Sequence, residues 1–145
     1  MKRVSQLTAL ALFCSLASLS SLAAEMPDTM TLSQLQEQHG AVIDTRASAF
    51  YNGWPQSLSG TSGHEPAALN LSASWLDAMS DEQIAIWAKQ HHLTPATSLA
   101  LYGGDNTNQA VKARLEKAGY THVSLLSDAL QTPARLQRLP HFEQL

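Results

Sequence analysis

One segment of the chain combines a strand, a polar loop and a helix start, an arrangement that can support nucleophilic chemistry. Leu99–Tyr102 reads as a buried strand, and the loop after it contains Gly103, Gly104, Asp105, Asn106, Thr107 and Asn108. Backbone N–H groups that point into such a loop, above the positive end of a helix dipole, form an anion pocket. A cysteine there would have a lowered pKa and act as a nucleophile. The loop contains no cysteine, so the sequence predicts the pocket without the nucleophile.

Two further sets of polar residues are candidates for a site. Asp44 and Arg46 follow the apolar run Ala41–Ile43 and could face a substrate, although a local ion pair that fixes the chain after this strand is the favoured interpretation. His64, next to Gly63, could act as a general base or a metal ligand. Its position on a turn favours a hydrogen bond to nearby backbone instead.

The sequence predicts neither a metal site nor a cofactor. His91 and His92 are adjacent, and consecutive helical side chains point about 100° apart, so the two rings do not converge on one ion. The glycine-rich loop after Tyr102 lacks the Lys and the Ser or Thr that follow the glycines of nucleotide-binding loops.

The N-terminus has the pattern of a secretory signal peptide. A short positive start precedes the apolar or small residues 7–22, and Ala23 completes a small-residue cleavage site, with Ala24 as the other candidate. We therefore expect residues 1–23 to be removed and residues 24–145 to be exported. The alternative is an uncleaved anchor or a buried helix.

Cleavage would change the charge and remove the thiol of the chain. Cys14 is the only cysteine, and it would be lost together with Lys2 and Arg3. Seven Lys and Arg would then stand against twelve Asp and Glu, a net charge of −5, with no basic patch. We therefore expect no nucleic-acid partner, and no membrane contact after cleavage because no other apolar run could span a bilayer.

Strands and helices alternate along the rest of the chain. Capping-box spacing predicts helix starts after Thr31 and Ser80. The expected strands are 41–43, 68–71, 98–102 and 122–126, and the expected helices are 32–39, 47–52, 81–90 and 108–118, with a helix or turn at 133–139. Asn106, Thr107 and Asn108 are typical N-cap residues for the helix over 108–118. This alternation predicts an α/β domain with a mostly parallel sheet flanked by helices, and a site at the C-terminal ends of its strands.

Three motifs in this order resemble the rhodanese (thiosulfate sulfurtransferase) family. Ile43-Asp44-Thr45-Arg46 resembles the family's strand ending in Asp-x-Arg, and Gly63–Asn70 is similar to its Gly-His-Ile-Pro-Gly-Ala-x-Asn. Leu101–Gln109 and Ala118–Val123 resemble the active-site loop and the Ala-Gly-Tyr-x-x-Val after its helix. The resemblance covers most of residues 24–145 and implies a rhodanese-like three-layer domain.

The same resemblance implies that the reaction is lost. Active members of the family carry a cysteine at the position of Gly103, which takes sulfur from a donor such as thiosulfate as a persulfide and passes it to an acceptor. Glycine has no atom that can do this. The family's loop often carries an arginine, whereas here the loop carries Asp105, whose carboxylate disfavours an anion by like-charge repulsion.

We therefore expect a single, catalytically silent rhodanese-like domain over residues 24–145, similar to the first module of a multidomain periplasmic sulfurtransferase. Its expected partners are other rhodanese domains of the same enzyme, and it would be a structural or regulatory module or a truncated remnant. Two alternatives remain open. The chain could be a subunit of an active enzyme whose catalytic domains are supplied in trans, or a periplasmic module that binds a small anion or a peptide at Gly103–Asn108.

Overall fold

The structure of the chain is a computed structural model that describes residues 26–54 and 61–140. The expected signal peptide, residues 1–23, lies outside these ranges. Within them, no helix combines the length and the hydropathy needed to cross a membrane.

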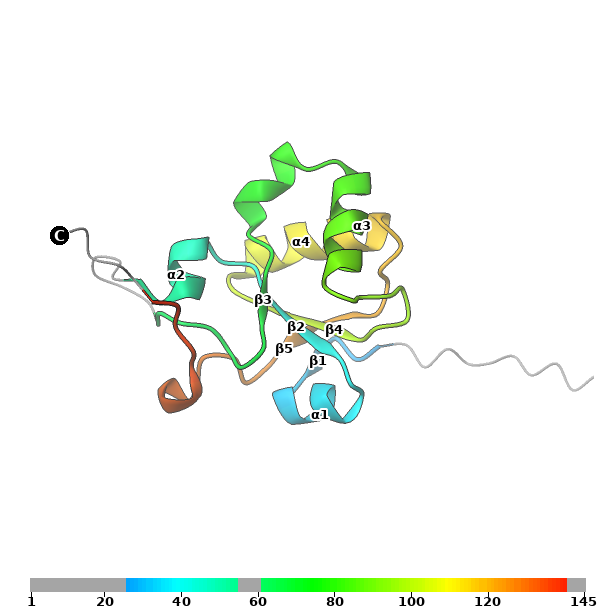
Figure 1. Ribbon diagram of the computed structural model, residues 1–145. Coiled ribbons are helices and arrows are strands. Elements are labelled where there is room, and N and C mark those ends of the chain that lie inside the picture. The colour runs from blue at the N-terminus through cyan, green and yellow to red at the C-terminus, as the bar shows by residue number, and fades with distance from the viewer. Residues whose placement is uncertain (1–25, 55–60, 141–145) are drawn as a thin grey trace, which may run out of the picture.

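Five parallel strands form a sheet at the centre of the domain, in the order β1-β5-β4-β2-β3 (Figure 1). They are β1 (Thr29–Met30), β2 (Ala41–Asp44), β3 (Leu69–Asn70), β4 (Leu99–Tyr102) and β5 (Val123–Leu126). The predicted parallel α/β sheet is confirmed. The sequence does not predict β1, because this strand has only 2 residues and pairs with Leu125 and Leu126 near the other end of the chain.

Helices cover both faces of the sheet, so the domain has three layers (Figure 1). One face is covered by the 3-10 helix η1 (Ala73–Ala78), α3 (Asp81–Gln90) and α4 (Asp105–Lys117), and the other by α1 (Leu32–Glu37). The short elements α2 (Ser48–Asn52) and η2 (Pro133–Arg135) lie beside these layers.

Side chains of the central strand alternate between two cores. Leu99 and Leu101 of β4 belong to the larger core, beneath α3 and α4, whereas Ala100 and Tyr102 belong to the smaller core beneath α1. This period of two is the expected consequence of strand geometry. It fixes which side chains at the end of β4 reach the candidate site.

Side-chain caps fix two of the predicted helix starts. Thr31 and Gln34 form a reciprocal capping box at α1, and Ser80 and Gln83 form another at α3. Each box satisfies backbone N–H groups that the first turn of a helix leaves unpaired.

The start of α4 differs from the prediction. The helix begins at Asp105 rather than Asn108, and its N-cap residue is Gly104. The Gly104 N–H donates to Thr107 Oγ1 at 2.9 Å, and Thr107 Oγ1 donates to the Gly104 carbonyl at 2.8 Å. The prediction that Asn106, Thr107 and Asn108 are N-cap residues is therefore wrong, because Thr107 caps the helix from within its first turn.

A buried glutamate holds the C-terminal segment against the domain. Glu65 is 0% exposed and accepts hydrogen bonds from Arg135 Nε and from the Leu130 N–H, both at 2.6 Å. His64 and Gln137 form an antiparallel bridge beside this ion pair. Of the helix or turn predicted over 133–139, only η2 is helical.

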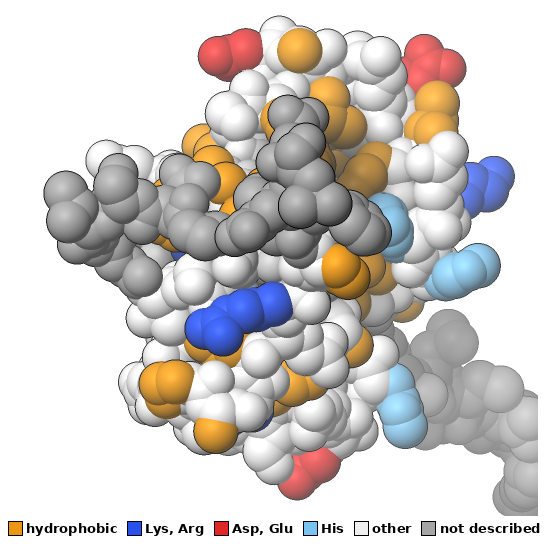
Figure 2. Space-filling model, turned by 60° about the vertical axis from the view of Figure 1, so that its left-hand side comes forward, with side chains coloured by type: hydrophobic (Ala, Val, Ile, Leu, Met, Phe, Trp, Pro, Cys, Tyr) orange, Lys and Arg blue, Asp and Glu red, His pale blue; other side chains and the backbone are white. Residues whose placement is uncertain are grey.

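Part of the surface is apolar. On the face shown in Figure 2, hydrophobic side chains are exposed at several places between polar ones, and acidic side chains lie at its upper and lower rims. Among the described residues, the large hydrophobic side chains that are exposed are Trp75, Ile86 and Leu139.

Candidate functional site

The candidate site lies where β2 and β4 end side by side. The two strands are parallel neighbours in a register that places Asp44 opposite Tyr102. The chain continues as Thr45-Arg46 after β2 and as Gly103-Gly104 after β4, and the Thr45 N–H donates to the Tyr102 carbonyl at 2.9 Å. Adjacent carboxyl ends of parallel strands are where α/β folds build their sites.

Gly103 has no room for a side chain. An ideal Cβ on Gly103 would lie 2.2 Å from Thr45 Oγ1, 3.2 Å from Thr107 Oγ1 and 3.4 Å from Arg46 Cγ. The residue also has a φ of +155°, a backbone conformation that residues with a side chain rarely adopt. The space of a side chain at this position is thus filled by the Thr45 hydroxyl.

Thr45 is held in that space by a buried network. Its side-chain oxygen lies 2.7 Å from Asn108 Oδ1, 2.9 Å from Thr107 Oγ1 and 3.1 Å from the Tyr102 carbonyl oxygen. Thr45 is 1% exposed and Asn108 is 7% exposed. The sequence does not single out Thr45, although its place between Asp44 and Arg46 puts it directly after a buried strand.

The predicted ion pair between Asp44 and Arg46 is present. Arg46 Nη2 lies 2.6 Å from Asp44 Oδ2 and Arg46 Nε lies 3.0 Å from Asp44 Oδ1, while the Asp44 side chain is fully buried. The remaining guanidinium donors reach the carbonyls of Thr61 and Gly63, both at 2.6 Å. The pair therefore fixes the loop after β2, as the sequence favours.

Tyr102 completes the buried polar cluster. The Arg46 guanidinium lies 5.4 Å from the centre of its ring, and its hydroxyl accepts the Glu65 N–H at 3.0 Å. Burial, together with the neighbouring Asp44 carboxylate, raises the pKa of the Tyr102 phenol. The raised pKa favours the protonated phenol, whose oxygen accepts the Glu65 N–H.

His64 has the backbone contact expected for it. Its Nδ1 lies 2.7 Å from the Tyr51 carbonyl oxygen, and its ring stacks on the Tyr51 ring with centroids 3.9 Å apart. Gly63, with a φ of +95°, lies so close to the Gln137 carbonyl that a Cβ would approach its oxygen to 2.9 Å. These contacts give both residues a structural role in joining α2 to the C-terminal segment.

Two hollows flank the glycine pair. One, of about 330 Å³, is lined by Arg46, Phe50, Gly104, Thr107 and Leu130 among others, and the second, of about 300 Å³, by Tyr102, Gly103, Asp105, Asn108 and Ser127 among others. The predicted anion loop is reduced to two glycines, because α4 begins at Asp105 and Thr107 accepts the Gly104 N–H. Arg46, the cation at this site, is already bonded to Asp44.

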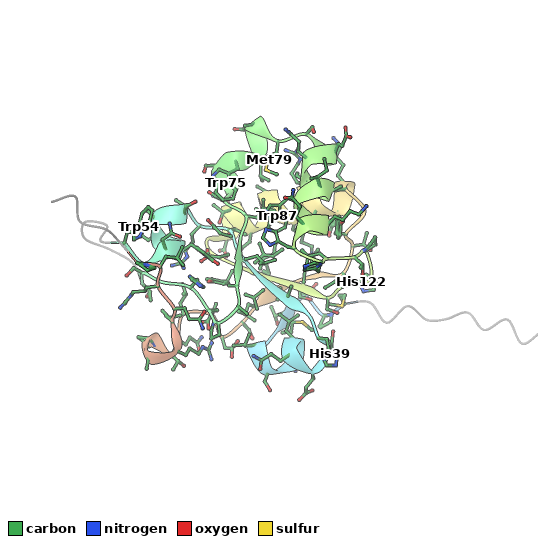
Figure 3. All side chains as sticks on the ribbon, viewed as in Figure 1. His39, Trp54, Trp75, Met79, Trp87 and His122 are labelled. Atoms are coloured by element: carbon green, nitrogen blue, oxygen red, sulfur yellow. The ribbon has the colours of Figure 1, made fainter. Side chains whose placement is uncertain are left out.

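The labelled tryptophan and histidine side chains in Figure 3 lie on several different elements. Trp75 is on η1 and 38% exposed, Trp87 is on α3 and packs against the larger core, and Trp54 follows α2. His91 is in ring contact with Trp87, with centroids 4.9 Å apart. In residues 26–54 and 61–140, no three His, Cys, Asp or Glu side chains come together in a way that could hold a metal ion.

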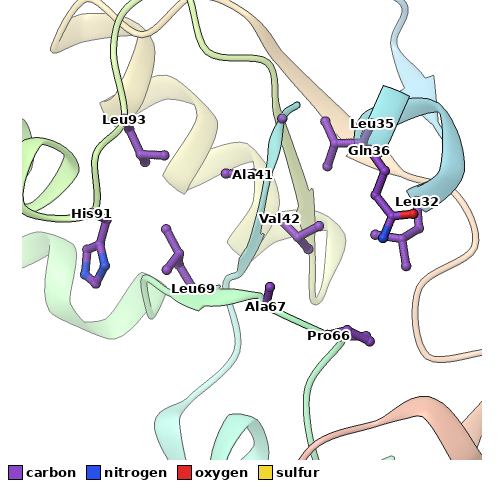
Figure 4. A pocket seen from close by; sticks show the side chains of 11 residues that line it. Leu32, Leu35, Gln36, Ala41, Val42, Pro66, Ala67, Leu69, His91 and Leu93 are labelled. Carbon is purple, nitrogen blue, oxygen red and sulfur yellow. The ribbon is translucent and has the colours of Figure 1, made fainter. Parts of the chain in front are cut away.

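A third hollow lies at the edge of the sheet, away from the glycine pair (Figure 4). It has a volume of about 230 Å³ and is bounded by Leu35 of α1, Val42 of β2, Leu69 of β3 and His91 after α3. Pro66, Ala67 and Leu69 of the second motif line it, and its lining contains neither the glycine pair nor Asp44, Thr45 and Arg46.

The parallel sheet between two helical layers, with a polar cluster at the ends of β2 and β4, is the rhodanese-like fold. No protein-family model matches the chain. The chain is 66% identical over all its 145 residues to the thiosulfate sulfurtransferase YnjE of Escherichia coli (strain K12) and spans 33% of that protein's length. The crystal structure of YnjE matches with a TM-score of 0.76, over 87% of this chain and 30% of that chain. The chain thus has the rhodanese-like fold and is similar to about a third of the length of that sulfurtransferase.

The fold is also similar to that of EanB. The wild-type structure of EanB is 26% identical with a TM-score of 0.60, over 74% of this chain and 26% of that chain. A variant of EanB in complex with ergothioneine is 25% identical with a TM-score of 0.62, over 79% of this chain and 28% of that chain.

Proposed function

We propose that this chain is a non-catalytic, structural or regulatory rhodanese-like domain that acts in the periplasm beside cysteine-bearing rhodanese domains of a thiosulfate sulfurtransferase. The observation that carries this proposal is the absence of any side chain at Gly103, where the family resemblance expects the nucleophilic cysteine. Residues 24–145 contain no other cysteine that could replace it.

Sulfur transfer from thiosulfate needs an atom that this site lacks. A thiolate attacks the outer sulfur of thiosulfate, the sulfur–sulfur bond breaks, and sulfite leaves with the bonding electron pair. The product is a cysteine persulfide, which gives its outer sulfur to the acceptor. Gly103 offers hydrogen in place of the thiolate, and the hydroxyls of Thr45 and Thr107 bond to neighbouring protein atoms.

The test of inactivity is an assay of the chain processed at Ala23 or Ala24. Thiosulfate and cyanide are mixed with the purified chain, and thiocyanate is measured, with E. coli YnjE as the positive control. We expect no thiocyanate above the protein-free background. Thiocyanate formed in proportion to the concentration of the chain would contradict the proposal.

Export is tested separately on the full chain. After expression in an enterobacterial host, the periplasmic fraction is extracted and the N-terminus of the product is sequenced. We expect the product to begin at Ala24 or Glu25. A product that retains Met1 and stays with the cells would contradict export by a cleaved signal peptide.

The alternative of catalytic domains supplied in trans is favoured by one observation. Trp75 on η1 exposes 38% of its surface, and large exposed aromatic side chains are common at protein interfaces. The test mixes the chain with YnjE from which the homologous third has been removed. An increase in thiocyanate formation, lost with Trp75→Ala and retained with Asp77→Ala on the same helix, would support this alternative, and an unchanged rate would exclude it.

A further inference from the structure

Thr45 blocks position 103 from carrying any side chain. We propose that two residues, Thr45 and Gly103, together exclude a sulfur carrier from this site, so that a cysteine placed at 103 alone would not fit the fold. This inference rests on the proposed function. It adds that position 103 not only lacks a cysteine but also has no space in the fold for its side chain.

The contact distances identify Thr45 as the obstacle. A Cβ at Gly103 would meet Thr45 Oγ1 at 2.2 Å, far inside the separation that non-bonded atoms tolerate. Thr107 Oγ1 at 3.2 Å and Arg46 Cγ at 3.4 Å are close contacts that small shifts can relieve. Of these three neighbours, Thr45 alone would have to move out of the way.

Thr45 cannot move easily. Its backbone is bonded on both sides, since its N–H donates to the Tyr102 carbonyl at 2.9 Å and its carbonyl accepts the Ala73 N–H at 3.1 Å. Its side chain is buried and bonded to Asn108 Oδ1 at 2.7 Å. Rotating the hydroxyl away would leave buried polar groups unpaired, which is costly.

A double-mutant cycle tests this coupling. Gly103→Ala is introduced into the full chain with Thr45, with Thr45→Ala and with Thr45→Ser, and the Tm of each protein is compared with that of its own Gly103 parent. Serine keeps the side-chain oxygen and alanine removes it. Coupling between two contacting residues appears as non-additivity in such a cycle.

We expect Gly103→Ala to lower the Tm by about 10 °C or more in the wild-type and Thr45→Ser backgrounds, and by half of that or less in the Thr45→Ala background. The part that remains reflects the φ of +155°. If Gly103→Ala abolishes folding in the background that retains Thr45, no Tm can be measured there. A cooperative unfolding transition that returns in the Thr45→Ala background would then support the inference in the same way.

Gly104 provides the matched control. It has a negative φ, and a Cβ there would meet only Thr107 Oγ1, at 3.5 Å. Gly104→Ala should therefore change the Tm little, and equally in all three backgrounds. The inference would be overturned if Gly103→Ala lowered the Tm equally in every background, or if it did not lower the Tm in the wild-type background, which retains Thr45. This experiment measures stability only. The proposed inactivity of the chain is tested separately by the thiocyanate assay, so the two can fail independently.

Discussion

Buried polar side chains at the ends of β2 and β4 are bonded to one another and to backbone. Asp44 holds Arg46, and Thr45 is bonded to Asn108 and lies against Thr107. Such groups are costly to leave unpaired, so each depends on its partners. At the scale of single residues, these contacts hold the ends of the two strands and the loops that follow them together.

Removing the charge of Asp44 should destabilise the domain strongly. Asp44→Asn leaves Arg46 without its buried counter-ion, and breaking a buried pair in this way costs about 3–5 kcal/mol. Denaturant unfolding monitored by circular dichroism measures the loss. Asp105→Asn, at an exposed position, is the control and should change the free energy of unfolding by about 0.5 kcal/mol or less. A loss below about 1 kcal/mol for Asp44→Asn would show that the pair has little weight in folding.

At Ala67 the chain departs, at a cost in stability, from the rhodanese motif that Gly63–Asn70 resembles. The motif has glycine here, and Ala67 has a φ of +59°, after Pro66, in a turn closed by a hydrogen bond from the Ala68 N–H to the Glu65 carbonyl at 3.0 Å. A left-handed conformation costs an alanine about 1 kcal/mol, so Ala67→Gly should raise the free energy of unfolding by about 0.5–1 kcal/mol. Ala68→Gly, at a buried position, should lower it. Both free energies are measured by denaturant unfolding. Changes of the same sign in the two variants would contradict this explanation.

At the scale of elements, α3 and α4 are joined by an acidic residue at the start of one helix and basic residues near the end of the other. Asp81 lies 3.1 Å from Lys117 Nζ and 3.3 Å from Arg114 Nε. Arg114 also donates to the carbonyls of Leu76 and Met79. Asp81 at the N-terminus of α3 and the basic residues at the C-terminus of α4 also interact favourably with the dipoles of their own helices.

This contact predicts a pH dependence. The hydrogen bond from Lys117 is the main cause that lowers the pKa of Asp81 below its ordinary value of 3.8. A lowered pKa stabilises the fold above the ordinary value, and the contribution is lost as the pH falls through the folded value. The Tm difference between wild type and Asp81→Asn should therefore be present at neutral pH and vanish in strong acid. Asp77→Asn is the control, and a difference that persisted unchanged in acid would disprove the assignment.

The ion pair between Glu65 and Arg135 connects the turn before β3 to the C-terminal segment. Arg135→Ala removes the counter-ion of a fully buried carboxylate and should loosen the residues that it holds. We expect faster amide hydrogen exchange at Leu130, whose N–H donates to Glu65, and at Gln137, with little change at Leu101 in β4. Exchange that stayed unchanged at Leu130 would show that the segment is held by other contacts.

At the scale of the whole molecule, local signals in the sequence predict the architecture well. The capping boxes at Thr31 and Ser80 and the alternation of strands with helices lie within short windows, and both are present. The contacts that define the site are non-local: Thr45 meets Asn108, and Glu65 meets Arg135. No short window contains both partners, so the closed state of position 103 emerges only in the folded chain.

The most direct test of a chain without a sulfur carrier is its intact mass after incubation with thiosulfate. A chain that starts at Ala24, as the proposed cleavage would leave it, contains no thiol that could hold sulfane sulfur. We predict a mass identical to that of the untreated protein, before and after addition of a reductant. A product heavier by one sulfur atom, which the reductant returned to the original mass, would contradict the proposal that this domain carries no sulfur.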